Sequence, residues 1–168
     1  SAGDAIFVLG QTEDELGGSE YHSAIGKAGG QVPRVAFRRN FLLYKKLQSA
    51  IGKRLVASCH DCSEGGLAVA LSECCMAGRL GAEVSLDTVA GKKLSAEAAL
   101  FSESAGRFVV SVKRKNEKAF AKAMRGVPLA RIGEAKAAGS LVAALRGAKV
   151  LDVPLTSLLA SFKGAMDW

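Results

Sequence analysis

The amino-acid sequence predicts a single domain with an α/β (α+β) fold. Short β-rich runs alternate with stretches of helical periodicity, and no long linker, low-complexity tract or internal repeat interrupts them. The 168 residues are 49% hydrophobic and 23% charged, which is the balance of a soluble globular protein. A chain of this length can bury roughly 70% of its unfolded surface, so one hydrophobic core is sufficient.

Strands are predicted from short apolar or alternating runs. The first is expected at Ala5–Leu9, because an unbroken apolar run this short is typical of a strand covered on both faces. Phe108, Val110 and Val112 share one face of a later strand. The other strands are expected at 55–59, 81–86, 107–112, 129–134, 141–145 and 149–151, the last three as a meander.

Helices are predicted where apolar residues recur at a spacing near 3.6. Leu43, Leu47, Ala50 and Ile51 define an amphipathic helix over 40–51, and Gly52 can supply its left-handed cap. A second helix is expected from Gly66 until Gly78 breaks it. The remaining helices are expected at 95–100, at 116–125 with Asn116 as the N-cap, and from Pro154 onward.

Charge and composition narrow the classes of partner. The net charge is +7, and the basic residues spread along the chain with a loose concentration from Arg34 to Arg54. This charge pattern favours a phosphate-bearing small molecule or an acidic partner surface about as much as it favours nucleic acid. Only 6% of residues are aromatic, so nucleic acid is not an expected partner. No apolar run reaches roughly 20 residues and no signal sequence opens the chain, so we expect a cytoplasmic protein without membrane contact.

The four cysteines Cys59, Cys62, Cys74 and Cys75 lie within seventeen residues of one another. This crowding differs from the dispersed pattern of a disulfide-stapled secreted domain and favours reduced core thiols. A zinc site that includes His60, and a nucleophilic thiol paired with His60, are the weaker alternatives, because adjacent side chains are poorly placed for either role. We therefore expect neither a metal site nor a catalytic residue.

The segment from Ser58 to Leu67 is the most informative for ligand binding. It passes from a strand into a helix through a loop rich in polar groups and glycine, and Ser63 can cap the helix. Gly65 and Gly66 lack the Cβ atoms that would keep an anion from the amides of the first turn. Turns of this kind also occur as plain structure, so the spacing leaves a phosphate site and a structural turn both open.

Two further segments carry polar groups at predicted element ends. Gly17 and Gly18 precede Ser19, which can cap a helix that contains Tyr21. Glu103 and Arg107 place a carboxylate and a guanidinium at the mouth of a strand. A structural ion pair between these two side chains is favoured over a ligand contact.

Taken in order, three motifs resemble the C-terminal, second-half domain of phosphoribosylformylglycinamidine synthase, within the aminoimidazole ribonucleotide synthetase superfamily. They are Glu15-Leu16-Gly17-Gly18-Ser19-Glu20-Tyr21, His60-Asp61-Cys62-Ser63-Glu64-Gly65-Gly66-Leu67, and Phe101-Ser102-Glu103-Ser104 with Gly106-Arg107-Phe108. The likeness runs over residues 3–168. The stretch Val153–Leu159 is similar to the closing helix of the family.

The resemblance implies an α/β domain with helices covering one face of a mixed sheet. It implies a part in an ATP-dependent amide ligase of purine biosynthesis, which uses magnesium and glutamine-derived ammonia to convert formylglycinamide ribonucleotide into formylglycinamidine ribonucleotide. The N-terminal domains of the synthase and a glutaminase subunit or domain are the implied partners. The isolated domain is expected to be inactive, because the partner domain supplies most metal carboxylates and nucleotide contacts in the family.

The resemblance also assigns candidate site residues. A nucleotide or phosphate is expected to contact His60, Asp61, Ser63, Glu64, Gly65 and Gly66, and the cleft is expected to be lined by Gly17, Gly18, Ser19, Glu20, Glu103 and Arg107. Two alternatives stay open. The domain is either a structural or auxiliary nucleotide-binding half that docks a glutaminase, or a relative of selenophosphate synthetase, thiamine monophosphate kinase or a hydrogenase-maturation protein.

Overall fold

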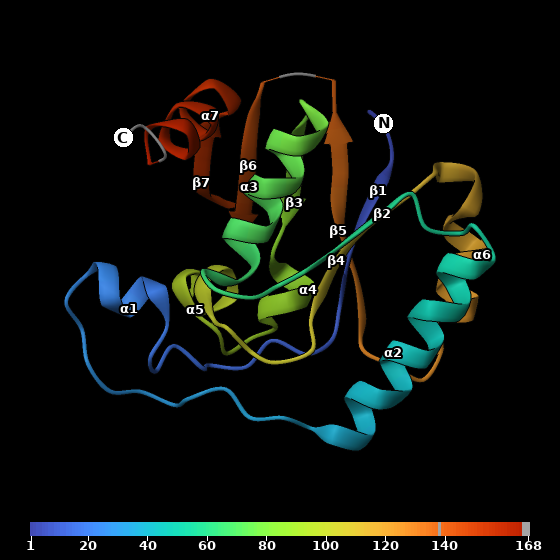
Figure 1. Cartoon of the computed structure of the whole chain (residues 1–168), viewed down its shortest axis with the longest axis horizontal. Coiled ribbons are helices and arrows are strands. Elements are labelled where there is room, and N and C mark those ends of the chain that lie inside the picture. Colours follow the sequence, from blue (N-terminus) through green and yellow to red (C-terminus); the bar gives the residue numbers. More distant parts are fainter. Residues whose placement is uncertain (138, 166–168) are drawn as a thin grey trace.

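The computed structural model describes residues 1–137 and 139–165 and contains a seven-stranded mixed sheet (Figure 1). The strand order is β2-β4-β1-β5-β3-β6-β7, and only the β3–β6 pair is parallel. The strands are β1 (Ala5–Leu9), β2 (Ser58–Asp61), β3 (Gly81–Ser85), β4 (Phe108–Val112), β5 (Leu129–Lys136), β6 (Ser140–Leu145) and β7 (Ala148–Pro154). The predicted α/β domain with a mixed sheet is confirmed.

The helices are α1 (Glu20–Ala24), α2 (Phe37–Gly52), α3 (Gly66–Gly78), α4 (Asp87–Ala90), α5 (Ala96–Phe101), α6 (Glu117–Ala123) and α7 (Leu155–Gly164), with a 3-10 turn at Arg114–Asn116. The predicted helix at 40–51, the helix that begins at Gly66 and the short helix near 95–100 are confirmed within a few residues. Within the described residues, no helix combines the length and apolar character that crossing a bilayer requires.

Strand β1 separates two hydrophobic clusters, because successive side chains of a strand point to opposite faces. Ile6 and Val8 belong to the larger cluster, which includes buried residues of α3, α4 and α5 and contacts from α7. Phe7 and Leu9 belong to a smaller cluster with α2 and α6. The expected helical cover of the sheet is present, and α2 with α6 adds a second, smaller layer on the opposite face.

Two local predictions are wrong. The last three strands do not form a meander, because β3 lies between β5 and β6 and pairs with both. Gly52 is the last residue of α2 but does not supply the left-handed cap: Lys53 is the C-cap, and the left-handed residue is Arg54, with φ of 57°. The Arg54 amide donates to Ile51 O and the Leu55 amide to Ala50 O, the bonding pattern of a Schellman motif, so β2 starts only at Ser58.

The second layer can be tested with two neighbouring leucines of α2. Leu43 is fully buried in the smaller cluster, whereas the Leu42 residue is 44% exposed. Leu43→Ala should lower the free energy of unfolding by about 2–5 kcal/mol, because it removes buried methyl groups and leaves a cavity. Leu42→Ala should change it by less than about 1 kcal/mol. Urea unfolding measures both, and equal losses would contradict the assigned orientation of α2.

Candidate functional site

Three loops meet at one end of the sheet. β1 and β2 are both antiparallel to β4, so their carboxyl ends lie beside the amino end of β4. The loops that leave or enter these ends span residues 10–19, 62–65 and 102–107. Figure 1 shows α1 and α5 near this end. The fold thus brings together the three motifs that were singled out in the sequence.

The turn between β2 and α3 is built on two glycines in the left-handed region. Gly65 is the N-cap of α3 with φ of 73°, and Gly66 begins the helix with φ of 65°. The predicted capping role of Ser63 is wrong. Its hydroxyl donates to the Asp61 carboxylate, and its carbonyl accepts a hydrogen bond from the Gly66 amide at 3.1 Å.

Close packing explains why both positions are glycine. A Cβ on Gly66 would lie 2.4 Å from the carbonyl oxygen of Ser102, and one on Gly65 would lie 2.2 Å from the Val69 side chain. Any side chain at either position would therefore collide with its neighbours and also adopt an unfavourable φ. The paired glycines join the turn tightly to the loop after α5, a packing role that exists without any ligand.

Glu103 joins two of the three motifs through one carboxylate oxygen. Its Oε1 accepts a hydrogen bond from the Gly65 amide at 2.8 Å and another from the Glu20 amide at 2.9 Å. These donors lie at the starts of α3 and α1, where an anion is favoured by unpaired amides and the helix dipole. A side chain of the protein thus occupies a position at which a bound anion was expected.

Arg107 does not form the expected ion pair with Glu103. Its side chain, only 1% exposed, donates to the carbonyl oxygens of Ser104 and Ser102 and to the Thr12 hydroxyl. Burial lowers the pKa of Arg107, while the nearby Cys62, Glu15 and Glu103 act in the opposite direction. The guanidinium binds neutral oxygens because the Glu103 carboxylate is engaged by backbone amides.

Serine side chains complete the connection between the loops. The fully buried Ser102 donates to Glu13 O at 2.6 Å and accepts from the Glu15 amide at 3.2 Å. Ser104 accepts from the Glu13 amide at 3.1 Å. Ser19 caps α1 as predicted by accepting from the His22 amide. The bridging roles of Ser102, Ser104 and Thr12 were not predicted, because no periodicity marks a hydroxyl whose partner lies some ninety residues away.

The outer surface of this end is acidic. Glu20, Asp61 and Glu64 are exposed, as are Glu13 and Asp14 in the loop after β1. The hydrogen bond from Ser63 is the main cause that lowers the pKa of Asp61. Oxygen ligands of this kind suit Mg²⁺. Across residues 1–137 and 139–165, however, no three His, Cys, Asp or Glu side chains gather closely enough to hold a metal ion.

Of the other predicted cleft residues, Gly17 is buried and Gly18 is exposed with a positive φ of 73°. A Cβ on Gly17 would lie 2.6 Å from Gly30 O, so this glycine also permits a close backbone contact. A Cβ on Gly18, in contrast, would have no heavy atom within 4 Å. Only Gly18 of this pair is therefore accessible from outside.

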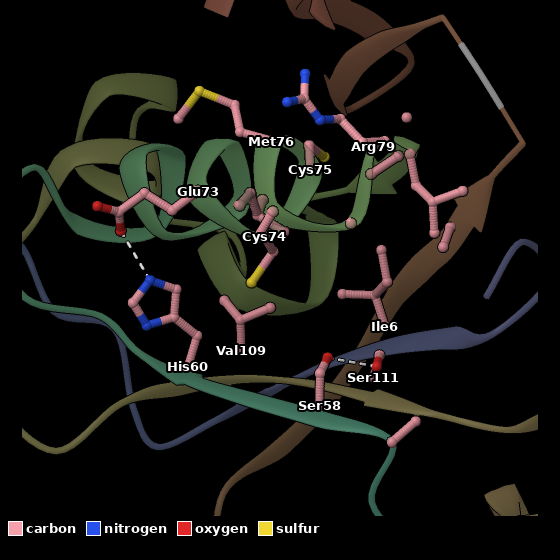
Figure 2. A pocket seen from close by; sticks show the side chains of 18 of the residues that line it. Ile6, Ser58, His60, Glu73, Cys74, Cys75, Met76, Arg79, Val109 and Ser111 are labelled. Carbon is pink, nitrogen blue, oxygen red and sulfur yellow. Dashed lines mark hydrogen bonds and ion pairs between the residues drawn. The ribbon is translucent and has the colours of Figure 1, made fainter. Parts of the chain in front are cut away.

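His60 faces away from the glycine turn. Its Nε2 lies 2.8 Å from the Glu73 carboxylate on α3 (Figure 2). Its Nδ1 lies 3.5 Å from the Asp61 carboxylate. The ring lines a groove of about 910 Å³ between α3 and the sheet, together with apolar side chains such as Ile6 and Val109. None of the other predicted ligand residues lines this groove, so His60 is separated from them.

The four cysteines are free thiols. Burial raises the pKa of Cys62, Cys74 and Cys75 to about 11. A thiol with such a pKa is almost entirely protonated at neutral pH and is a poor nucleophile. The prediction of core thiols agrees with the burial of Cys62 and Cys75, whereas Cys59 is exposed.

Comparison with known proteins places this geometry in context. Residues 1–146 match the family described as AIR synthase related protein, C-terminal domain. PurL of Thermotoga maritima complexed with FGAR is 21% identical, with a TM-score of 0.83 over 94% of this chain and 28% of that chain. Hydrogenase maturation protein HypE in complex with ATP is 17% identical, with a TM-score of 0.63 over 91% of this chain and 50% of that chain.

A further structure, phosphoribosylformylglycinamidine synthase II from Thermotoga maritima, gives a TM-score of 0.78 at 21% identity, over 94% of this chain and 26% of that chain. At these identities the likeness shows the fold. The chain spans only about a quarter to a half of the structures it matches.

The role of Glu103 can be tested by comparing Glu103→Ala with Glu103→Gln. The alanine variant removes the acceptor of two amides and should lower the free energy of unfolding by about 1–3 kcal/mol, with faster hydrogen exchange at Gly65 and Glu20. The glutamine variant keeps a carbonyl oxygen and should lose less. Unchanged exchange at both amides in Glu103→Ala would show that the carboxylate does not hold these loops.

The cysteines give a pH-dependent prediction. With a pKa of about 11, Cys62 should resist iodoacetamide at pH 8 and react faster as the pH rises toward 11, because only the thiolate attacks. Burial and the Asp61 charge also raise the pKa of Cys59, but this thiol is exposed and should react before Cys62. Unfolding should make all four thiols reactive. Peptide mapping by mass spectrometry follows each site. Rapid alkylation of Cys62 in the folded chain would contradict its burial.

Proposed function

Because the chain belongs to the AIR synthase related protein C-terminal domain family, we propose that it forms the C-terminal part of a phosphoribosylformylglycinamidine synthase. The full enzyme would convert formylglycinamide ribonucleotide, ATP and ammonia into formylglycinamidine ribonucleotide, ADP and phosphate. The observation that carries this proposal is the meeting of three ordered motifs at one sheet end, joined by Glu103. The matched PurL structures with FGAR and with ATP support it.

We propose that the glycine turn contributes one wall of a nucleotide site. The Gly65 and Gly66 amides are engaged by Glu103 and Ser63, so ligand contacts fall to the exposed outer residues Asp61, Ser63 and Glu64. The carboxylates would repel a bare phosphate at this surface. A magnesium ion between carboxylate and phosphate removes that repulsion, and phosphates supply part of the coordination of Mg²⁺ in such sites. The ligand would therefore be a magnesium nucleotide.

The rest of the site would come from a partner domain. Of the ten large hydrophobic residues that are exposed in the described part of the chain, seven lie in the range from Ile25 to Tyr44. Phe37, in the first turn of α2, is 73% exposed. Exposed apolar residues gathered in one region mark an interaction surface. Gln11, in the loop after β1, accepts a hydrogen bond from Arg39 of α2, so this region adjoins the candidate site. We assign it to the preceding domains of the same synthase, without which the chain would lack synthase activity.

A second candidate function is a structural half that supports a catalytic half and docks a glutaminase. The observation in its favour is that Glu103 already fills the anion position at the starts of α1 and α3. The Gly65 amide in the glycine turn already donates to the Glu103 carboxylate, so the turn requires no nucleotide in order to fold. Nucleotide binding by the isolated chain distinguishes the two functions.

The nucleotide proposal is tested by hydrogen exchange with ADP and magnesium. Magnesium ADP at millimolar concentration should slow exchange at the amides of residues 61–67. Asp61→Asn should weaken this binding roughly tenfold when magnesium is present, by removing a charged ligand, and should not weaken binding of metal-free ADP. Asp152→Asn, on the distant strand β7, is the matched control. No protection at 61–67 in the folded chain would favour the structural half.

A further inference from the structure

A polar pocket lies at the end of the sheet opposite to the glycine turn. It has a volume of about 530 Å³ and is lined by Ser1, Asp4, Arg54, Val56, Ala57, Lys113, Lys115 and Asn116. These residues adjoin the start of β1 and the end of β4, where Ala5 pairs with Val112. The glycine turn adjoins the other end of the same strands, and a five-residue strand is about 17 Å long. The two sites are therefore separate.

Three cations line this pocket from three different parts of the chain. Arg54 follows α2, Lys113 follows β4, and Lys115 belongs to the 3-10 turn. Among the described residues, none of the three has a carboxylate within ion-pair distance. The lining contains one carboxylate, that of the buried Asp4. With three cationic side chains and one anionic side chain, the lining carries a net positive charge.

The backbone of one of these cationic residues has a defined conformation. Arg54 sits at the left-handed position of the Schellman motif that ends α2, a place where glycine is usual. The side-chain amide of Asn116, which also lines the pocket, donates to the Arg54 carbonyl oxygen at 3.3 Å. The end of α2 and the 3-10 turn are therefore joined directly at the pocket wall.

We propose that this pocket binds a phosphate-bearing small anion through Arg54, Lys113 and Lys115. Guanidinium and ammonium groups form the strongest hydrogen bonds to phosphate oxygens, and a polar pocket with three cations suits a diphosphate or triphosphate better than an apolar ligand. A free polyphosphate and the phosphate chain of a nucleotide share this chemistry. Unlike the glycine turn, the site needs no metal ion, because its lining is cationic.

Titration of the chain with phosphate-bearing anions tests the position of the proposed site. In metal-free buffer of low ionic strength, pyrophosphate and ATP are titrated separately into isotope-labelled chain while backbone amide shifts are recorded. Shifts should centre on residues 54–57 and 113–116 and spare residues 61–67. Equal affinity for the two ligands would indicate a polyphosphate site, and tighter ATP binding with additional shifts a nucleotide site.

Two glycine substitutions separate the pocket from general charge effects. Arg54→Gly should weaken pyrophosphate binding roughly tenfold, because it removes a charge-assisted hydrogen bond. Arg79→Gly is the matched control, since Arg79 occupies the same left-handed Schellman position after α3, with φ of 53°, outside this pocket. Neither change should lower the melting temperature, because glycine adopts a positive φ without strain.

Three results would overturn the proposal. These are the absence of shifts around residues 54 and 113–116, equal weakening by Arg54→Gly and Arg79→Gly, and tighter, strongly salt-dependent binding of random duplex DNA at the same residues. The last result would assign the cations to a nucleic-acid surface. Binding of magnesium ADP at the glycine turn is measured at the amides of residues 61–67, which are different from those of the pocket. The two proposals can therefore be contradicted independently.

Discussion

A buried guanidinium organises the functional end of this domain. Arg107 is almost fully enclosed, and a charge removed from water costs several kcal/mol unless hydrogen bonds compensate it. Here the acceptors come from the loop after β1, through Thr12, and from the loop before β4, through Ser102 and Ser104. Both loops must therefore close around Arg107, and Ser102 and Glu103 are fixed as a result.

The position of Glu103 then determines how the two helix starts are related. Its carboxylate can accept from Gly65 and Glu20 only while the loop around Arg107 holds its backbone in place. The Ser102 carbonyl oxygen, which also accepts from Arg107, is the nearest atom that a Cβ at Gly66 would meet, and this contact explains why the position has no side chain. Sequence positions that look like independent motifs are thus parts of one hydrogen-bonded unit.

Most of the fold could be predicted from local patterns, whereas the pairing of distant groups could not. The run Ala5–Leu9 and the helical spacing of Leu43 and Leu47 report burial directly, so β1 and α2 were found in the sequence. The insertion of β3 between β5 and β6 depends on the whole sheet, and adjacent strands in sequence need not pair. Likewise, a Glu103–Arg107 ion pair was inferred from proximity in sequence, but backbone amides compete for that carboxylate.

Charge is distributed unevenly along the chain. Residues 21–60 contain eight lysines and arginines and no aspartate or glutamate, while the other 128 residues contain fifteen basic and sixteen acidic residues. The net charge of +7 therefore comes from one segment, which runs from the margin of the acidic glycine turn along α2 to Arg54 at the far pocket.

Under the two proposals, one small domain would present two kinds of anion surface. At the acidic end a phosphate would bind together with a metal ion that neutralises the carboxylates, whereas at the cationic end it would bind directly. Because Glu103 accepts hydrogen bonds from amides at both helix starts, the acidic end needs no bound anion to complete these hydrogen bonds. The proposed partner domain would then have to supply only the missing metal ligands.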